Sequence, residues 1–285
     1  GVFRLGCFSG PAARANMLDV QMPYHYPVPR WFKALRCKEW RAFQFGDSRF
    51  YAMAALYEGK TFSLVLFNAW DKERKKAYEF RKVLPPRSFG IGENLDGSEI
   101  AYRGRKFSLS MASPLSEGVV LVEVEAAKRG PRPAFSGSFR FAYNARQTAP
   151  CSACMPLGLN RALYSLKVLM PMEGWFETKD ERYDFAAADS MGVLDDHKGY
   201  YPFRMRYDWV SGFGVDQKGR RVGFNLTHNQ VKDQSLYNEN LLWINSRAFP
   251  LPPVRVTRPQ GPAGVWHIQD TEGLVDLLFK PERKH

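Results

Sequence analysis

The run from Asp195 to Trp209 holds the densest group of polar and aromatic side chains in this sequence. Two neighbours in it, Asp196 and His197, are residue types suited to acid–base chemistry, because an imidazole titrates near neutral pH and a carboxylate beside it can fix its tautomer. Adjacent residues on a strand point to opposite faces, so a structural histidine at the mouth of a hairpin is the alternative. If the chain catalyses a reaction, we expect Asp196 or His197 to be the proton donor.

The second half of this run alternates with a period of two. On a strand, its polar and apolar side chains would lie on opposite faces. The polar face would hold Arg204, Arg206 and Asp208, and the apolar face Phe203, Met205, Tyr207 and Trp209. The polar face is either an ion-paired exterior or, if it turns toward a barrel interior, a ligand pocket, because buried guanidinium groups need carboxylate partners. The sequence leaves both interpretations open.

A second polar group, Asn225, Glu239 and Asn240, could orient a ligand through amide and carboxylate hydrogen bonds, or could simply satisfy turn backbone. Metal ligation is conceivable by residue type, but no HxH or HExxH spacing occurs; the candidate ligands would be Asp195, Asp196, His197, His228 and Glu239. The four cysteines include a CxxC pair, Cys151 and Cys154, without further zinc ligands nearby or a βαβ context. We therefore expect reduced thiols, no metal and no cofactor.

The chain is basic, and its charge is unevenly distributed. The net charge is +12 over 285 residues, of which residues 1–150 carry +11 and residues 151–285 carry +1. The basic first half either forms a solvated surface or meets an anionic partner such as RNA, an acidic protein or an anionic lipid. No apolar run is long enough for a transmembrane helix. We expect an intracellular protein, of the cytoplasm or the mitochondrial matrix.

Short alternating runs enriched in β-branched and aromatic residues predict strands at 62–67, 119–124, 135–143, 222–226 and 254–256. Turn signals such as Glu58-Gly59, Lys218-Gly219 and Glu272-Gly273 lie beside such runs and favour hairpins. The segment 71–82 is the best candidate for a helix, with a charged hairpin as the alternative. These patterns predict an all-β protein with few short helices.

The segment 56–68 and the segment 215–227 share a pattern, and a Leu-Pro-Pro sequence follows each. A tryptophan-containing strand, at Trp40 or Trp209, precedes each of them. Such internal similarity indicates duplication. We therefore predict two tandem antiparallel barrels or sandwiches, a basic domain at 1–150 and a second domain at 156–285.

Several motifs resemble an uncharacterised family, domain of unknown function 2804. They are KGYYPFR at 198–204, GRRVGFNL at 219–226, NEN at 238–240, the VDL, Phe and Pro positions of 275–281, and PLGLNR at 156–161. The resemblance covers most of the chain. It implies a distant similarity to carotenoid-hydratase and AttH-type proteins, which have two tandem lipocalin-like (calycin) barrels.

Two functions remain open. The first is binding of an apolar or amphipathic small molecule in a barrel cavity, with hydratase- or isomerase-like chemistry as an extension. The ligand-binding residues would then be Tyr200, Arg204, Arg206, Asp208, Trp209, Asn225, Glu239, Asn240 and Trp243. The second is a non-catalytic accessory subunit of a large assembly such as a ribosome or a respiratory complex, with a sugar- or protein-binding module as a further alternative.

Overall fold

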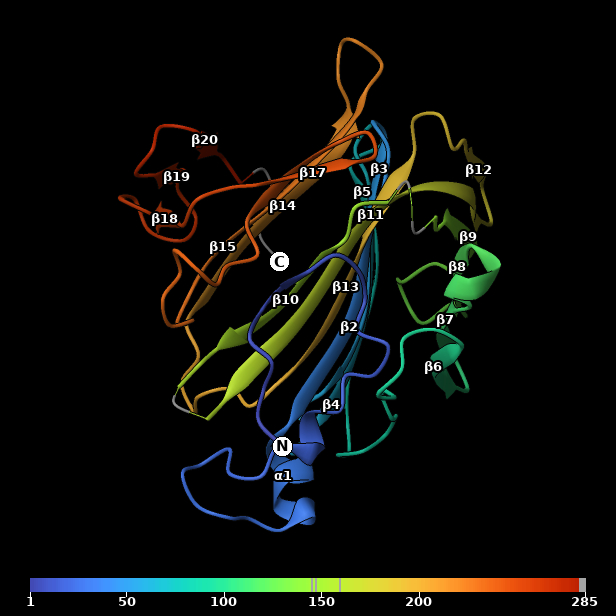
Figure 1. Ribbon diagram of the computed structural model, residues 1–285. Helices are drawn as coiled ribbons and strands as arrows, with labels where there is room; N and C mark the ends of the chain where they lie inside the picture. The colour runs from blue at the N-terminus through green and yellow to red at the C-terminus, as the bar shows by residue number, and fades with distance from the viewer. Residues whose placement is uncertain (145, 147, 159, 282–285) are drawn as a thin grey trace.

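The computed structural model describes residues 1–281 except 145, 147 and 159, and this part of the chain is mostly β-structure (Figure 1). Its helical elements are short: α1 (Arg30–Arg36) and two single turns, η1 (Met17–Asp19) and η2 (Leu115–Glu117). The end of the expected second domain, residues 282–285, lies outside the described residues. None of the helices within the described ranges is long and apolar enough to cross a membrane.

Thirteen strands form one antiparallel sheet, in the main order β5-β4-β3-β2-β13-β11-β9-β8-β7-β6. The first four strands along the chain in this path are β2 (Lys38–Gly46), β3 (Phe50–Glu58), β4 (Ser63–Asp71) and β5 (Lys76–Leu84). They are followed by β6 (Ser98–Gly104), β7 (Phe107–Ser113), β8 (Val119–Ala126), β9 (Phe135–Ala142), β11 (Ala162–Thr178) and β13 (Met191–Gly199). Three short strands pair at the sides: β1 (Gly6–Phe8), β10 (Cys151–Pro156) and β12 (Arg182–Phe185).

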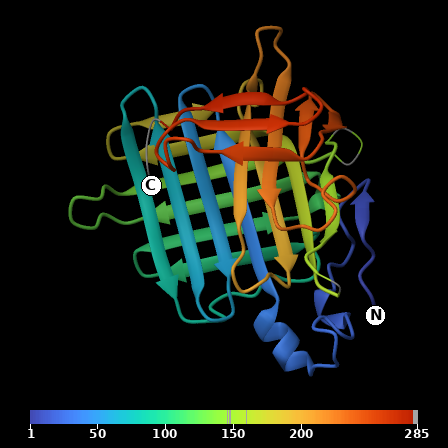
Figure 2. The same ribbon diagram turned by 90° about the vertical axis from the view of Figure 1, so that its left-hand side faces the viewer.

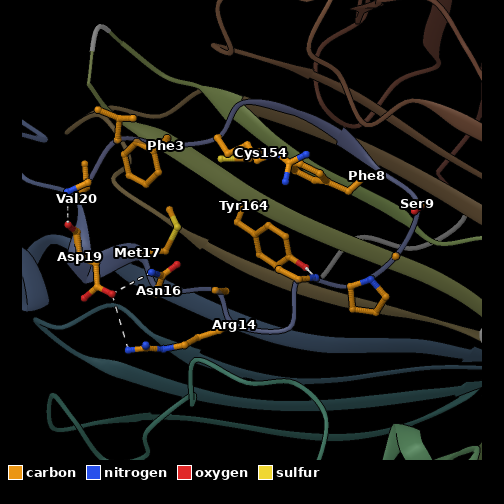
Figure 3. A pocket seen from close by; sticks show the side chains of 17 residues that line it. Phe3, Phe8, Ser9, Arg14, Asn16, Met17, Asp19, Val20, Cys154 and Tyr164 are labelled. Atoms are coloured by element: carbon orange, nitrogen blue, oxygen red, sulfur yellow. Dashed lines mark hydrogen bonds and ion pairs between the residues drawn. The ribbon is translucent and has the colours of Figure 1, made fainter.

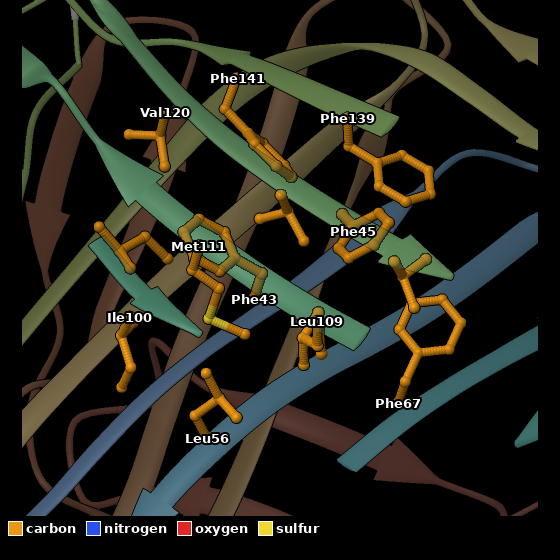
Figure 4. Packing of buried hydrophobic residues seen from close by; sticks show 14 of the residues in the cluster. Phe43, Phe45, Leu56, Phe67, Ile100, Leu109, Met111, Val120, Phe139 and Phe141 are labelled. Carbon is orange, nitrogen blue, oxygen red and sulfur yellow. The ribbon is translucent and has the colours of Figure 1, made fainter. Parts of the chain in front are cut away.

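The large sheet curls over, so that the layer β6–β9 crosses behind the layer β2–β5 (Figure 2). The space between the two layers is filled by large apolar side chains, including Phe43 and Phe45 from β2 and Phe139 and Phe141 from β9, all at most 1% exposed (Figure 4). Gly192 of β13 leaves room for this packing, because a Cβ there would lie 2.5 Å from the Phe141 ring. The space between these two layers is therefore a packed core where these aromatic side chains lie.

A second antiparallel sheet, β14-β15-β16-β17, lies against the outer face of β11 and β13 (Figure 1). Its strands are β14 (Tyr207–Val215), β15 (Arg221–Asn229), β16 (Leu241–Ile244) and β17 (Arg247–Pro250). Leu241 and Trp243 of this sheet pack on Leu169 of β11 and Val193 of β13. A third sheet, β18 (Val254–Thr257), β19 (Trp266–Asp270) and β20 (Asp276–Phe279), packs on the second through a cluster that includes Leu226.

The structure confirms the predicted fold class, all-β with few short helices. Strands occupy the five predicted runs, and the two similar segments form the hairpins β3–β4 and β14–β15. The segment 71–82 forms the turn and most of the second strand of the hairpin β4–β5 and is not a helix; within β5, Tyr78 is buried and Phe80 packs against the core, whereas Arg81 is exposed.

The large sheet also draws strands from both sides of the expected linker. β13 pairs with β2 and β11 pairs with β9, so hydrogen bonding crosses from residues 156–285 into residues 1–150. The division into domains at 1–150 and 156–285 stays a prediction. Two such domains would share the strands of one sheet.

Candidate functional site

The strand register brings polar side chains together on the outer face of the large sheet. Along one row, Tyr57, Trp40, His197 and Ser165 are paired neighbours on β3, β2, β13 and β11. In the next row, Asp195 of β13 pairs with Lys167 of β11. Because residues two apart on a strand share a face, Asp195, His197, Ser165 and Lys167 all point toward the second sheet.

The strand β13 is buried along its whole length, although its sequence MGVLDDHKG contains four ionisable residues. It lies in the middle of the large sheet and is covered on both faces, by the aromatic core on one side and by the second sheet on the other. Buried ionisable groups need partners, and each face of β13 supplies them.

Lys167 is the centre of the cluster on the outer face. Its side chain is fully buried, and its Nζ lies 2.7 Å from Glu239 Oε2, 3.1 Å from Asp195 Oδ1 and 2.7 Å from His197 Nε2. It also donates a hydrogen bond of 3.0 Å to Ser165 Oγ. One ammonium group thus links two buried carboxylates and an imidazole.

Glu239 reaches this cluster from the loop that precedes β16, and it is fully buried. Ser165 and Tyr207 both donate hydrogen bonds to its carboxylate. Its backbone carbonyl accepts a 2.7 Å bond from Asn225 Nδ2, while Asn225 Oδ1 accepts a 2.7 Å bond from Trp209 Nε1. The second sheet therefore holds the carboxylate of Glu239 and the indole of Trp209 in fixed positions.

The electrostatic consequences are opposite for the carboxylate and the phenol. Burial alone would raise the pKa of Glu239, but the charges and hydrogen bonds of Lys167 and His197 hold it well below its usual value. For Tyr207, burial and the adjacent charges of Glu239 and Asp195 raise the pKa well above its ordinary value. At neutral pH, Glu239 is a carboxylate that accepts hydrogen bonds and Tyr207 is a phenol that donates one.

A pocket of about 480 Å³ opens above this cluster, between the large sheet and the second sheet. Its lining is mostly apolar and aromatic: Lys38, Glu39, Trp40, Met53, Tyr57, Asp195, His197, Tyr201, Pro202, Phe203, Met205, Tyr207 and Trp209. An apolar cavity of this size with a few convergent polar groups is the usual form of a small-molecule site.

His197 connects the buried cluster to the pocket. Its Nε2 faces Lys167, Ser165 Oγ at 2.7 Å and Asp195 Oδ1 at 3.0 Å. Its Nδ1 lies 3.5 Å from the Tyr201 hydroxyl, which also lines the pocket. The opposite carboxylate oxygen of Asp195 accepts a 3.1 Å bond from Trp40 Nε1. This arrangement gives a proton at the pocket wall a short path to three buried ionisable groups.

The two residues expected to be catalytic lie on opposite faces of β13. His197 lines the pocket, whereas Asp196 points into the core side of the sheet and accepts a 2.9 Å bond from Arg41 Nε. Asp195, not Asp196, therefore shares a face with His197. Tyr200 is also on the core side, where its hydroxyl donates a 3.0 Å bond to the Met17 carbonyl.

The other expected ligand-binding residues separate into three groups. Trp209 lines the pocket. Glu239 lies beneath the pocket in the cluster around Lys167, and Asn225 binds the indole of Trp209. Arg204 and Arg206 are exposed and do not line it, and Asp208 pairs with Arg258. Asn240 binds the backbone of Thr227 and Pro252, and Trp243 packs between the sheets with its Nε1 on the Ala149 carbonyl. The alternation read from Pro202 onward starts too early, because the strand begins only at Tyr207.

Sequence reasoning missed Lys167, Ser165, Tyr201 and Trp40. Lys167 had a detectable signal, since it is the single charged residue in the apolar run 162–172, a position where a lysine is buried only with partners. The others are ordinary strand or loop residues by type. Only the register of β2, β11 and β13 places them beside His197.

A pocket of about 520 Å³ lies on the other side of β11, beneath the N-terminal segment (Figure 3). Tyr164 points into it, and its hydroxyl accepts a 2.9 Å bond from the Ala12 backbone N–H. The charged groups at its rim, Arg14 and Asp19, lie 3.8 Å apart and are largely exposed. The described residues that line this second pocket include no buried cluster of ionisable groups comparable to that around Lys167.

The CxxC cysteines, Cys151 and Cys154, are free thiols whose pKa burial raises. Burial raises the pKa of Cys154 to about 12, and the described residues contain no disulfide. In the same residues, no group of His, Cys, Asp and Glu has a geometry that could hold a metal ion.

Several of the basic side chains in the first half form ion pairs, such as Arg74 with Glu181 at 2.5 Å and Arg103 with Glu99 at 2.6 Å. The expected anionic partner gains no support from these contacts.

Comparison with known proteins places the chain in a family. Residues 3–285 match the family described as Domain of unknown function (DUF2804), and the chain belongs to it. No curated protein matches the sequence. Among solved structures, the crystal structure of CghA is 12% identical, with a TM-score of 0.53 over 94% of this chain and 78% of that one.

Two further structures have similar coverage. CghA with Sch210972 is 12% identical, with a TM-score of 0.52 over 94% of this chain and 82% of that one. Kievitone hydratase from Nectria haematococca is 10% identical, with a TM-score of 0.49 over 94% of this chain and 82% of that one. The likeness to CghA is one of fold, and it agrees with the lipocalin-like fold expected from the sequence.

Proposed function

We propose that this member of the DUF2804 family binds an apolar or amphipathic small molecule in the pocket between its two sheets and catalyses proton transfer on it. The observation that carries the proposal is the position of His197, which lines an apolar pocket while its Nε2 contacts a fully buried Lys167. Structural ion pairs are common, but a charged cluster whose imidazole is accessible to a ligand cavity is typical of acid–base sites.

The roles follow from the geometry. His197 exchanges a proton with the ligand, alone or through the Tyr201 hydroxyl at 3.5 Å. Asp195, held by Trp40, and Lys167, held by Glu239, fix the orientation of the imidazole and balance its charge. Trp209 and Met205 form the apolar wall that positions the ligand.

The reaction class is addition or removal of a proton at carbon, as in hydration or double-bond isomerisation. In an isomerisation, His197 takes a proton from one carbon and returns one to another, so the ligand's composition does not change. In a hydration, a proton is added to one carbon and the oxygen of water to its neighbour, and the proton that this water loses returns to the site. Neither reaction needs an oxidant or a reductant.

The test compares the wild-type protein with His197→Gln in a small-molecule extract prepared in heavy water. We expect the wild type to incorporate deuterium into at least one carbon-bound position of an extract component, or to change its mass by one water molecule, and His197→Gln to abolish the change. Arg204→Gln, at an exposed position outside the pocket, is the matched control and should keep the activity. An extract that the wild type leaves unaltered in mass and in deuterium content would refute the catalytic part of the proposal.

A further inference from the structure

Lys38 is a charged residue in the lining of the apolar pocket that has no carboxylate partner. Its Nζ makes one long hydrogen bond, 3.4 Å to the Gly59 carbonyl, and no acidic side chain of the described residues lies within ion-pair distance of it. Burial and the neighbouring charge of Arg36 lower its pKa. A cation at such a place is available to a ligand.

The other charged residues of the lining are already paired. Glu39 binds Lys60, and Asp195 and His197 belong to the buried cluster around Lys167. The remaining lining residues that the structure describes are aromatic and apolar side chains, among them three tyrosines and a proline, so they offer no second free charge. Among the lining residues that the structure describes, Lys38 is therefore the one cation without a carboxylate partner.

The strand register fixes the place of Lys38 relative to His197. Lys38 lies two residues before Trp40 on β2, and Trp40 is the direct partner of His197 on β13. Residues two apart on a strand share a face and are separated by roughly 7 Å. Lys38 and His197 are thus diagonal neighbours on the adjacent strands β2 and β13, roughly 7–8 Å apart along the same wall of the pocket.

We infer that Lys38 binds an anionic group of the ligand, so that the substrate is an organic acid with a mostly apolar body. This inference rests on the proposed function, because it names the substrate class of the same pocket. A single cation in an apolar lining selects by charge, since an uncharged ligand of the same shape would leave the ammonium without a partner.

Three matched probes test the inference: decanoate, decanol and decylammonium, which share an apolar body and differ in their charge. Binding is followed by tryptophan fluorescence, because Trp40 and Trp209 line the pocket. We expect the wild type to bind decanoate about tenfold more tightly than decanol, and to bind decylammonium most weakly, as one charge-assisted hydrogen bond predicts. The preference for decanoate should weaken as salt concentration rises.

The variants separate a charge effect from a loss of structure. Lys38→Gln should remove the preference for decanoate over decanol while leaving decanol binding unchanged, and Lys38→Glu should make decylammonium the preferred probe. Lys128→Gln, at an exposed loop position, should bind all three probes like the wild type. Equal binding of decanoate and decanol by the wild type, or an unaltered preference in Lys38→Gln, would overturn the inference and leave the proposed pocket intact. Failure of every probe to bind would overturn both.

Discussion

Replacing Lys167 by methionine tests the central contact of the site. The methionine retains an unbranched chain of similar length but removes the ammonium that lies 2.7 Å from Glu239 and 3.1 Å from Asp195. Both carboxylates are buried, at 0% and 3% exposed, so they would lose their cation without gaining water. Breaking a buried charge pair by removing one partner costs about 3–5 kcal/mol, and we expect Lys167→Met to lose this much unfolding free energy at pH 7.

The same variant should respond to pH with a definite sign. In the wild type, Lys167 holds the pKa of Glu239 well below its usual value. Without Lys167, burial becomes the dominant influence and raises that pKa above its value in the unfolded chain. Glu239 then takes up a proton on folding, so the stability deficit of Lys167→Met relative to the wild type is largest at neutral pH. This deficit shrinks as the pH falls toward about 4 to 5, the range in which a glutamate ordinarily titrates.

Urea unfolding followed by tryptophan fluorescence measures both effects. Lys128→Met, at an exposed loop position, is the control and should unfold like the wild type. The double variant Lys167→Met with Glu239→Gln should be more stable than the sum of the two single losses predicts, because the Glu239 carboxylate is then no longer buried without its cation, although Asp195 still is. A deficit under about 1 kcal/mol at pH 7 would refute the reasoning, since surface ion pairs alone contribute that little. A deficit that is equally large at acidic pH would refute the assignment to Glu239.

Three further outcomes follow from the same contacts. Wild-type stability should fall as the pH drops below the ordinary glutamate pKa of 4.5, because the stabilising ionisation of Glu239 is then lost, and Glu239→Gln should show a flatter acid limb; identical limbs in urea titrations would contradict this. Phe141→Ala should cost about 3–5 kcal/mol by leaving a cavity in the core, with little effect on probe binding in the pocket, and a loss below about 1 kcal/mol would show that the core collapses around it. Asn225→Ala should weaken decanol binding several-fold by releasing Trp209 and the Glu239 carbonyl, whereas Arg204→Ala should not; calorimetry of both variants decides.

The fold could be read from the sequence because strand periodicity is local. The runs at 62–67 and 222–226 alternate clearly, and their turns carry Gly at the expected positions. The pairing of β13 with β2 could not be read in this way, because it joins residues about 150 apart in the chain and no local pattern specifies which central strands become neighbours. The prediction of two tandem domains says nothing of this long-range pairing, and the division at 1–150 and 156–285 stays a prediction.

The sequence predicted only part of the candidate site, because residue types can be read locally but the strand pairing that brings them together cannot. His197 was chosen because its residue type carries acid–base chemistry, and Glu239 because its carboxylate could orient a ligand; both lie in the cluster. Asp196 was chosen over Asp195 although period two already placed Asp195 on the face of His197. Arg204 and Arg206 were assigned to a strand that begins only at Tyr207. Because they precede the strand, their alternation does not place them on a face of the sheet.

The seventeen-residue strand β11 exchanges partners midway along its length. Up to Pro171 it pairs with β13, and from Met172 onward it pairs with β9. One continuous strand thus carries Lys167 in its first part and pairs with the layer β6–β9 in its second part. Opening of either part therefore disturbs the hydrogen bonding of the other. A ligand that stiffens the Lys167 end should therefore slow amide hydrogen exchange on the distant strand β9, although it touches no residue there.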